Sequence, residues 1–223
     1  MGEAIGQSLP VAVGVLVSPL PIVAVVLMLV SARARANALA FVVGWFLAVL
    51  VLVGVVALLA GTAAPDDDGP ATWTGWLKIV LGVLLLFLSV RQWRGRPRGG
   101  TEPPAPKWMA AIEQFTPVKS AGLAVLLGAV NPKNLLLVVS GGAAIAAAQP
   151  ADTTTTVVAA LVFAVVASAG VVTPVVIYFS MGPRAARVLD ELKTRMIHNN
   201  AAIMAVLLLV IGAKMLGDGI SVL

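Results

Sequence analysis

Two short proline-containing stretches interrupt long apolar segments of this sequence and carry the residues best suited to binding chemistry. They are SPLP at residues 18–21 and NPKN at residues 131–134. Proline lacks a backbone N–H and its ring clashes with the preceding helical turn, so each stretch should break a helix. Ser18 and Asn131 belong to the residue types that cap helix N-termini, and proline is favoured in the turn that follows. Each stretch therefore predicts the end of one half-helix and the start of another.

Two helix starts that meet inside a protein could bind an anion. Each helix N-terminus exposes unpaired N–H groups and the positive end of the helix dipole. Lys133 adds a cation near the centre of its apolar segment, where an ammonium costs at least ~2.5 kcal/mol to insert and normally faces a polar interior. We favour a substrate-facing role for Lys133 over snorkelling or a structural bond to carbonyls that Pro132 leaves without a donor. The predicted substrate site consists of Ser18, Pro19, Pro21, Asn131, Pro132, Lys133 and Asn134.

The composition of the chain is that of a membrane protein. Of its 223 residues, 60% are hydrophobic and 11% are charged, whereas roughly a quarter are charged in soluble domains. A membrane span needs about 20 mostly apolar residues, and none of the segments that qualify has an Asp or Glu well inside it. The six predicted spans are 9–31, 38–62, 73–92, 120–148, 156–181 and 199–218.

Several function classes are excluded or disfavoured by what the sequence lacks. The chain has no cysteine, which excludes disulfide frameworks, thiolate metal sites and dithiol redox chemistry. It contains no P-loop pattern, zinc-ligand cluster or catalytic triad. We therefore expect a protein that is not an enzyme, with no catalytic residue, no metal site and no cofactor.

The basic residues lie in alternate connections between the predicted spans. The three connections after spans one, three and five hold 12 Lys and Arg, whereas the other short connections and the N-terminal tail hold none. Lys and Arg in short loops mark the cytoplasmic side. This distribution predicts a multi-pass membrane protein with both termini extracytoplasmic. It also explains the basic excess without nucleic-acid binding.

The six predicted spans form two similar sets of three. Spans one and four share a polar-plus-proline break at mid-span, and spans three and six share a uniform Leu/Val character. Because each set has an odd number of spans, the second set must be inverted, which is typical of secondary transporters. The predicted fold is an all-α membrane protein with a first repeat at 1–93, a cytoplasmic linker at 94–119 and a second repeat at 120–223.

The linker has two interpretations. It opens with Pro, Gly and Arg, and then places Trp108, Ile112 and Phe115 at helical spacing. A short amphipathic helix in the membrane interface would fit this spacing. A solvated loop with a few apolar anchors fits it equally well.

The same residues resemble a known family. The chain is similar to the GAP family of actinobacterial membrane proteins, described as peptidoglycolipid- or sulfolipid-addressing (Sap-like) proteins of the LysE transporter superfamily. The resemblance implies six spans in two inverted repeats and movement of envelope glycolipids across the plasma membrane. The superfamily's thiol-redox branch is excluded by the missing cysteines, and its metal branch is disfavoured because acidic membrane motifs are missing. The resemblance rests on SPLPI at 18–22, SARARAN at 31–37, GW at 44–45, PKW at 106–108 and NPKNL at 131–135.

Our leading hypothesis is a transporter or flippase that exports an anionic lipid or glycolipid by alternating access. Arg33, Arg35 and Asn37 follow span one and either attract an anionic headgroup or only set topology. The first alternative is an exporter of a small soluble anion or amino acid. The second is a scaffold that hands a lipid to another exporter without transporting it. A homo-oligomer, or association with lipid-synthesis or export proteins, is compatible with each role.

Overall fold

The computed structural model describes residues 1–62, 72–96, 111–148, 152–221 and 223. Within these residues the chain is helical and contains no strand. A long π-helical stretch and two short 3-10 turns connect some of the α-helices. In chain order the elements are α1 Gly2–Leu16, α2 Pro19–Leu29, α3 Ala34–Thr62, α4 Thr72–Arg94, η1 Ile112–Gln114, α6 Pro117–Val125, η2 Leu126–Val130, α7 Pro132–Ala146, α8 Thr153–Met181, η3 Gly182–Arg184 and α9 Ala185–Ile220.

Both predicted helix breaks are confirmed. The chain bends by 51° between α1 and α2, and by 64° between the α6–η2 segment and α7. Pro19 and Pro132 are the first helical residues after the two breaks, as expected for a residue with a helical φ and no N–H to donate. Before the second break, η2 has π-helical geometry and the Asn131 N–H donates to the Leu126 carbonyl at 2.8 Å.

The predicted count of six spans is not confirmed by length and composition alone. Three helical segments qualify as membrane spans on their own, and up to five qualify if each bent pair is one span. The longest of these segments has 68 residues, from Thr153 to Ile220, and it contains both α8 and α9. The helices also begin earlier than the apolar pattern predicted, because α1 starts at Gly2 rather than near residue 9.

Helix α3 is apolar on all sides but packs against the rest of the protein with only one face. Its buried face recurs every four residues and its opposite face exposes large apolar side chains, a pattern typical of a helix between protein and lipid. It packs against α6, α7 and α8. The buried residues are Phe41, Trp45, Val49, Val53 and Ala57, and exposed ones include Val43, Leu47, Val51 and Val55.

Helices α4 and α9 form an antiparallel pair joined by small residues. Gly82 and Gly212 bring the two backbones together, since a Cβ on Gly82 would lie 2.9 Å from the Gly212 carbonyl oxygen. Small residues allow such close approach between membrane helices. The contacts recur every seven residues along each helix and pair Gly75 with Gly219, Gly82 with Gly212 and Ser89 with Ala205.

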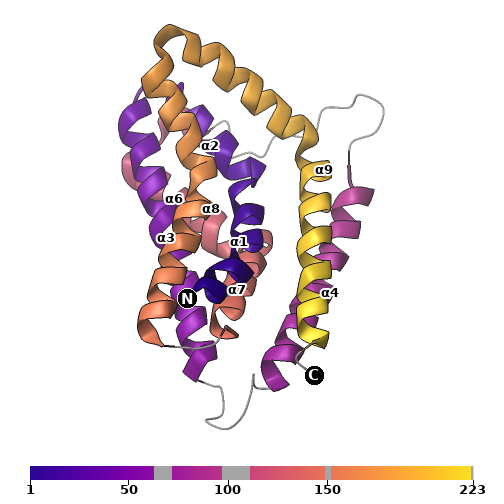
Figure 1. Cartoon of the computed structure of the whole chain (residues 1–223). Helices are drawn as coiled ribbons and strands as arrows, with labels where there is room; N and C mark the ends of the chain where they lie inside the picture. The colour runs from indigo at the N-terminus through magenta and orange to yellow at the C-terminus, as the bar shows by residue number, and fades with distance from the viewer. Residues whose placement is uncertain (63–71, 97–110, 149–151, 222) are drawn as a thin grey trace.

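The molecule has two distinct ends (Figure 1). Helix α9 first crosses the upper end and then turns down beside α4, while both termini lie toward the lower end. The upper end carries the basic turn before α3, where the Arg35 guanidinium lies 5.7 Å from the ring centroid of Phe179 on α8. We call the upper end the basic end and the lower end the terminus end.

Most of the predicted linker, including Trp108, lies outside the described residues. In the described part, two apolar side chains turn inward. Ile112 is buried in the hydrophobic core, and Phe115 packs against that core. The Phe115 carbonyl accepts a hydrogen bond of 2.9 Å from the Asn37 amide.

Candidate functional site

Asn134 joins the two helix breaks. Its Oδ1 accepts a hydrogen bond of 2.7 Å from the Ser18 hydroxyl, and its Nδ2 donates to the Leu127 carbonyl at 2.7 Å. In the π-helical register of η2, Leu127 is the residue whose carbonyl loses its donor because Pro132 has no N–H. Asn134 is fully buried. One side chain therefore replaces the missing donor of the second break and connects that break to the first.

Ser18 and Asn131 both occupy N-cap positions, but only Asn131 caps with its side chain. The Asn131 Oδ1 accepts from the Lys133 N–H at 3.1 Å, as predicted. The predicted capping bond of Ser18 is absent, because its hydroxyl is used by Asn134 instead. Pro19 and Pro21 are buried beside Ser18, and as prolines they supply no N–H donor. Ser18, Pro19 and Pro21 are therefore buried structural residues of the first helix break.

The other predicted site residues line a hollow of about 450 Å³, which we call the cationic pocket. Such a volume lies within the ~300–1,000 Å³ typical of small-ligand sites. Two cations of the pocket come from different helices, Lys133 from the start of α7 and Arg91 from the last turn of α4. The full lining is Leu88, Arg91, Gln92, Gly95, Asn131, Pro132, Lys133 and Leu208.

Arg91 and Gln92 are pocket residues that the sequence pattern does not predict. Arg91 belongs to the basic residues that predict the topology, and Gln92 follows it at the end of an apolar helix. The only sequence signal was that two polar residues end α4. Their place beside Lys133 depends on how α4 packs near the second break.

Lys133 does not bond to the carbonyl that Pro132 leaves without a donor. That carbonyl is occupied by Asn134, whereas the Lys133 Nζ contacts the Sδ of Met204 on α9. A thioether is a weak acceptor and carries no charge. Within the described ranges, the three ion pairs join Lys193 to Asp190, Arg195 to Glu191 and Lys214 to Asp218. None of these ion pairs among the described residues involves Lys133.

A second basic hollow lies at the turn between α2 and α3. It has a volume of about 450 Å³ and is lined by residues 31–36 with Tyr178 of α8. Arg33 and Arg35 belong to this hollow, as a headgroup-attracting role requires. Asn37 does not, because it is fully buried and its amide holds the Phe115 carbonyl.

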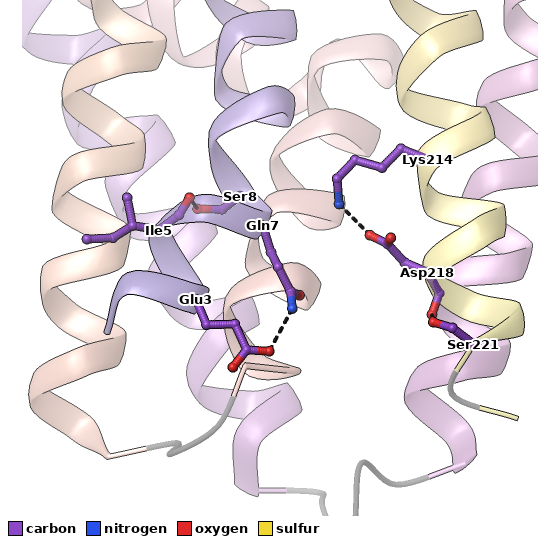
Figure 2. Close-up of polar contacts among 7 residues, drawn as sticks. All are labelled: Glu3, Ile5, Gln7, Ser8, Lys214, Asp218 and Ser221. Carbon is purple, nitrogen blue, oxygen red and sulfur yellow. Dashed lines mark hydrogen bonds and ion pairs between the residues drawn. The ribbon is translucent and has the colours of Figure 1, made fainter.

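A cluster of charged residues lies at the terminus end, where α1, α4 and α9 meet (Figure 2). Glu3 accepts a hydrogen bond of 2.9 Å from Gln7 on α1, and these residues face the Lys214–Asp218 ion pair on α9. Lys78 of α4 is buried and lies within electrostatic range of Glu3, Lys214 and Asp218. Lys214 and Asp218 have the (i, i+4) spacing at which opposite charges meet on one face of a helix. We call this group the charged cluster.

The charged cluster corrects one expectation from the sequence. Glu3 and Asp218 both lie inside helical segments that qualify as membrane spans. The predicted span 9–31 began after Glu3, and Asp218 is the last residue of the predicted span 199–218. No group of three or more metal-ligating side chains occurs in the described part of the chain.

These features define an α-helical membrane protein with two broken helices and a cationic pocket beside one of them. The chain matches, over residues 9–221, the family model described as Sap, sulfolipid-1-addressing protein, and it belongs to that family. Searches of curated proteins and of solved structures gave no match. The family places the protein in a role linked to lipid export.

Proposed function

We propose that this protein is a transporter or flippase that exports an anionic lipid or glycolipid toward the cell envelope. The observation that carries the proposal is the cationic pocket, in which Arg91 and Lys133 line one hollow with Gln92 and Asn131. The family description names a sulfolipid, and the acidic group of a sulfolipid is an anion. Guanidinium and ammonium groups bind such anions by charge-assisted hydrogen bonds.

The spans of this transporter number six in our proposal. A helical segment of 68 residues would be ~100 Å long at ~1.5 Å per residue, about three times the hydrocarbon thickness of ~30 Å. It is too long for a single crossing, and Figure 1 shows that it reverses direction at the upper end, so in our proposal it crosses the membrane twice, once as α8 and once as the later part of α9. With α3, α4 and the two bent pairs, the total is six.

The arrangement of the helices supports two inverted repeats. The contact between α4 and α9 is nearly symmetric. Gly82 packs against Gly212 at its centre, and a pair of small residues packs one step of seven residues away on either side. Each repeat opens with a broken helix, and the breaks meet through Ser18 and Asn134. This organisation is typical of secondary transporters and of the LysE superfamily that the sequence resembles.

The position of two polar features supports alternating access. The cationic pocket lies toward the basic end, since it includes Arg91 and Gly95 at the end of α4. The charged cluster lies at the terminus end between α1 and α9. We propose that the structure represents a state open to the basic end, with the charged cluster closing the other side.

Reconstitution of the purified protein into liposomes tests this proposal. The probes are a fluorescent sulfated galactosylceramide and a fluorescent phosphatidylcholine, each placed in the inner leaflet. Accessibility of the fluorophore to external dithionite measures movement across the bilayer. We expect the sulfated lipid to move faster than in protein-free liposomes, and faster than phosphatidylcholine.

The same preparation separates the alternative functions. Efflux of labelled lysine or sulfate without lipid movement would identify an exporter of small soluble molecules. Retention of the sulfated lipid on the purified protein without any flux would identify a lipid-addressing scaffold. Either result would end the flippase proposal.

A further inference from the structure

A third hollow lies on the outside of the α4–α9 pair, and we call it the outer groove. Its volume is about 360 Å³. On α4, the cationic pocket uses residues 88, 91, 92 and 95, whereas the outer groove uses residues 89, 90, 93 and 94. At 3.6 residues per turn these two sets lie on opposite faces of the helix. The outer groove is lined by Ser89, Val90, Trp93, Arg94, Ala205, Val206 and Leu209.

The lining of the outer groove is apolar. Val90, Trp93, Val206 and Leu209 are each about half exposed. The Ser89 hydroxyl is unavailable to a ligand, because it donates to the Ala205 carbonyl at 2.6 Å. Ser89 and Ala205 are small residues, and their contact leaves a depression between the larger side chains on either side. The groove thus suits an apolar chain that needs no hydrogen bonds.

One end of the outer groove carries two guanidinium groups. Arg94 lines the groove directly. Arg96 lies over the ring of Trp93, with its guanidinium 3.7 Å from the ring centroid, which is a cation–π contact. Tryptophan and arginine are typical of the membrane interface, where a ring lies at headgroup level and cations attract anionic lipids.

We propose that the outer groove binds an anionic membrane phospholipid, with one acyl chain in the groove and its phosphate between Arg94 and Arg96. The acyl chain matches the apolar lining, and the phosphate matches the cationic end. A helix of a partner protein would leave both guanidinium groups without an anion. The site is separate from the cationic pocket and does not depend on the proposed transport function.

Native mass spectrometry of the full-length protein tests the headgroup part of this proposal. The purified protein is incubated with equimolar palmitoyl-oleoyl phosphatidylglycerol and phosphatidylcholine, which have the same acyl chains. We expect one phosphatidylglycerol to be retained in preference to phosphatidylcholine. In the double variant Arg94→Gln with Arg96→Gln, this preference should fall by roughly 10- to 30-fold. The control variant Arg184→Gln with Arg187→Gln removes two arginines elsewhere at the basic end and should keep the preference.

A second pair of variants tests the acyl-chain part. Val206→Trp fills the outer groove, whereas Val210→Trp adds the same bulk at an exposed position of α9 outside it. Val206→Trp should lower retention of both lipids, and Val210→Trp should leave it unchanged. Equal phosphatidylglycerol preference in wild type and the double arginine variant would overturn the proposal. Equal retention in the two tryptophan variants would overturn it as well, since the groove would then be ordinary lipid-facing surface.

Discussion

At the scale of single residues, the predicted site has a structural part and a ligand-facing part. The structural part is buried and connects the two helix breaks; it consists of Ser18, Pro19, Pro21 and Asn134. Asn131, Pro132 and Lys133 line the cationic pocket. The division follows from chemistry, because an amide can both accept from a hydroxyl and donate to a carbonyl. An ammonium cannot accept, and its charge is better matched by an anion.

Lys133→Met tests the ligand-facing part. Methionine keeps much of the length and removes a cation that contacts only a thioether among the contacts described for its Nζ. We expect the thermal unfolding midpoint to stay near wild type and the affinity for the sulfated lipid to fall at least about tenfold, since hydrogen bonds to charged groups are worth ~1.5–3 kcal/mol. Lys133→Arg should rescue poorly, because a planar fork does not replace a compact ammonium.

Met204→Leu is the matched control for this variant. It removes the thioether that Lys133 contacts and keeps the positive charge. Binding of the sulfated lipid should survive in Met204→Leu. Normal lipid binding in Lys133→Met would show that the lysine has only a packing role.

Asn134→Leu tests the structural part. Leucine has a similar size but leaves the Ser18 hydroxyl and the Leu127 carbonyl without their present partner. Each buried polar group left unsatisfied costs about 1–3 kcal/mol, so the loss of both bonds should lower the free energy of unfolding by roughly 2–6 kcal/mol. Ser18→Ala should cost less in the Asn134→Leu background than in wild type, because the two residues share one bond. The cycle is measured by unfolding in detergent. If the changes in free energy of unfolding simply add, the hydrogen bond between Ser18 and Asn134 does not connect the two breaks.

The helix breaks could be predicted from the sequence, but the residues that contact each break from other helices could not. A proline acts on its own helix, so Pro19 and Pro132 could be interpreted from local sequence. The partner of Ser18 lies 116 residues away, and no local pattern encodes that separation. Arg91 was missed for the same reason, because the pocket exists only where α4 packs near the start of α7.

At the scale of helices, the first break also depends on close packing by α8. A Cβ at Gly170 would lie 2.0 Å from the carbonyl oxygen of Leu16, the last residue of α1. The obstacle is backbone, which cannot rotate away as a side chain can. The structure gives this glycine a specific role, because it lets α8 lie directly against the break.

Gly170→Ala should therefore destabilise the protein. Overpacking a well-packed interior costs about 1–3 kcal/mol, and a backbone contact belongs at the upper end of that range. Gly217→Ala is the matched control on α9, where a Cβ would meet nothing within 4 Å. Alanine favours a helix over glycine by up to ~1 kcal/mol, so this variant should be neutral or slightly more stable. Equal unfolding midpoints for both variants would contradict the close contact between α8 and Leu16.

At the scale of the whole molecule, the basic connections between helices and the chain termini lie at opposite ends. The connections from α2 to α3 and from α8 to α9, which carry Arg33, Arg35 and Arg184, lie at one end, while both termini lie toward the opposite end (Figure 1). The sequence could predict this asymmetry. Alternate connections of a multi-pass chain lie on the same side of the membrane, however the helices pack, and the basic residues of the loops occupy alternate connections. It could not predict the charged cluster, which needs α1, α4 and α9 to converge.

Cysteine labelling tests the orientation of this asymmetry in the membrane. The chain has no native cysteine, so single cysteines can be placed without a background. Gly2→Cys and Ser221→Cys occupy exposed positions at the terminus end, whereas Ala36→Cys and Ala186→Cys occupy exposed positions at the basic end. A membrane-impermeant maleimide should label the first two on intact cells and the last two only after permeabilisation. The physical reason is that Lys and Arg near span ends resist translocation, which fixes Ala36 and Ala186 inside together with their basic neighbours. Labelling of Ala36→Cys on intact cells would show the opposite orientation. The cationic pocket would then open to the outside and could not load lipid from the cytoplasmic leaflet.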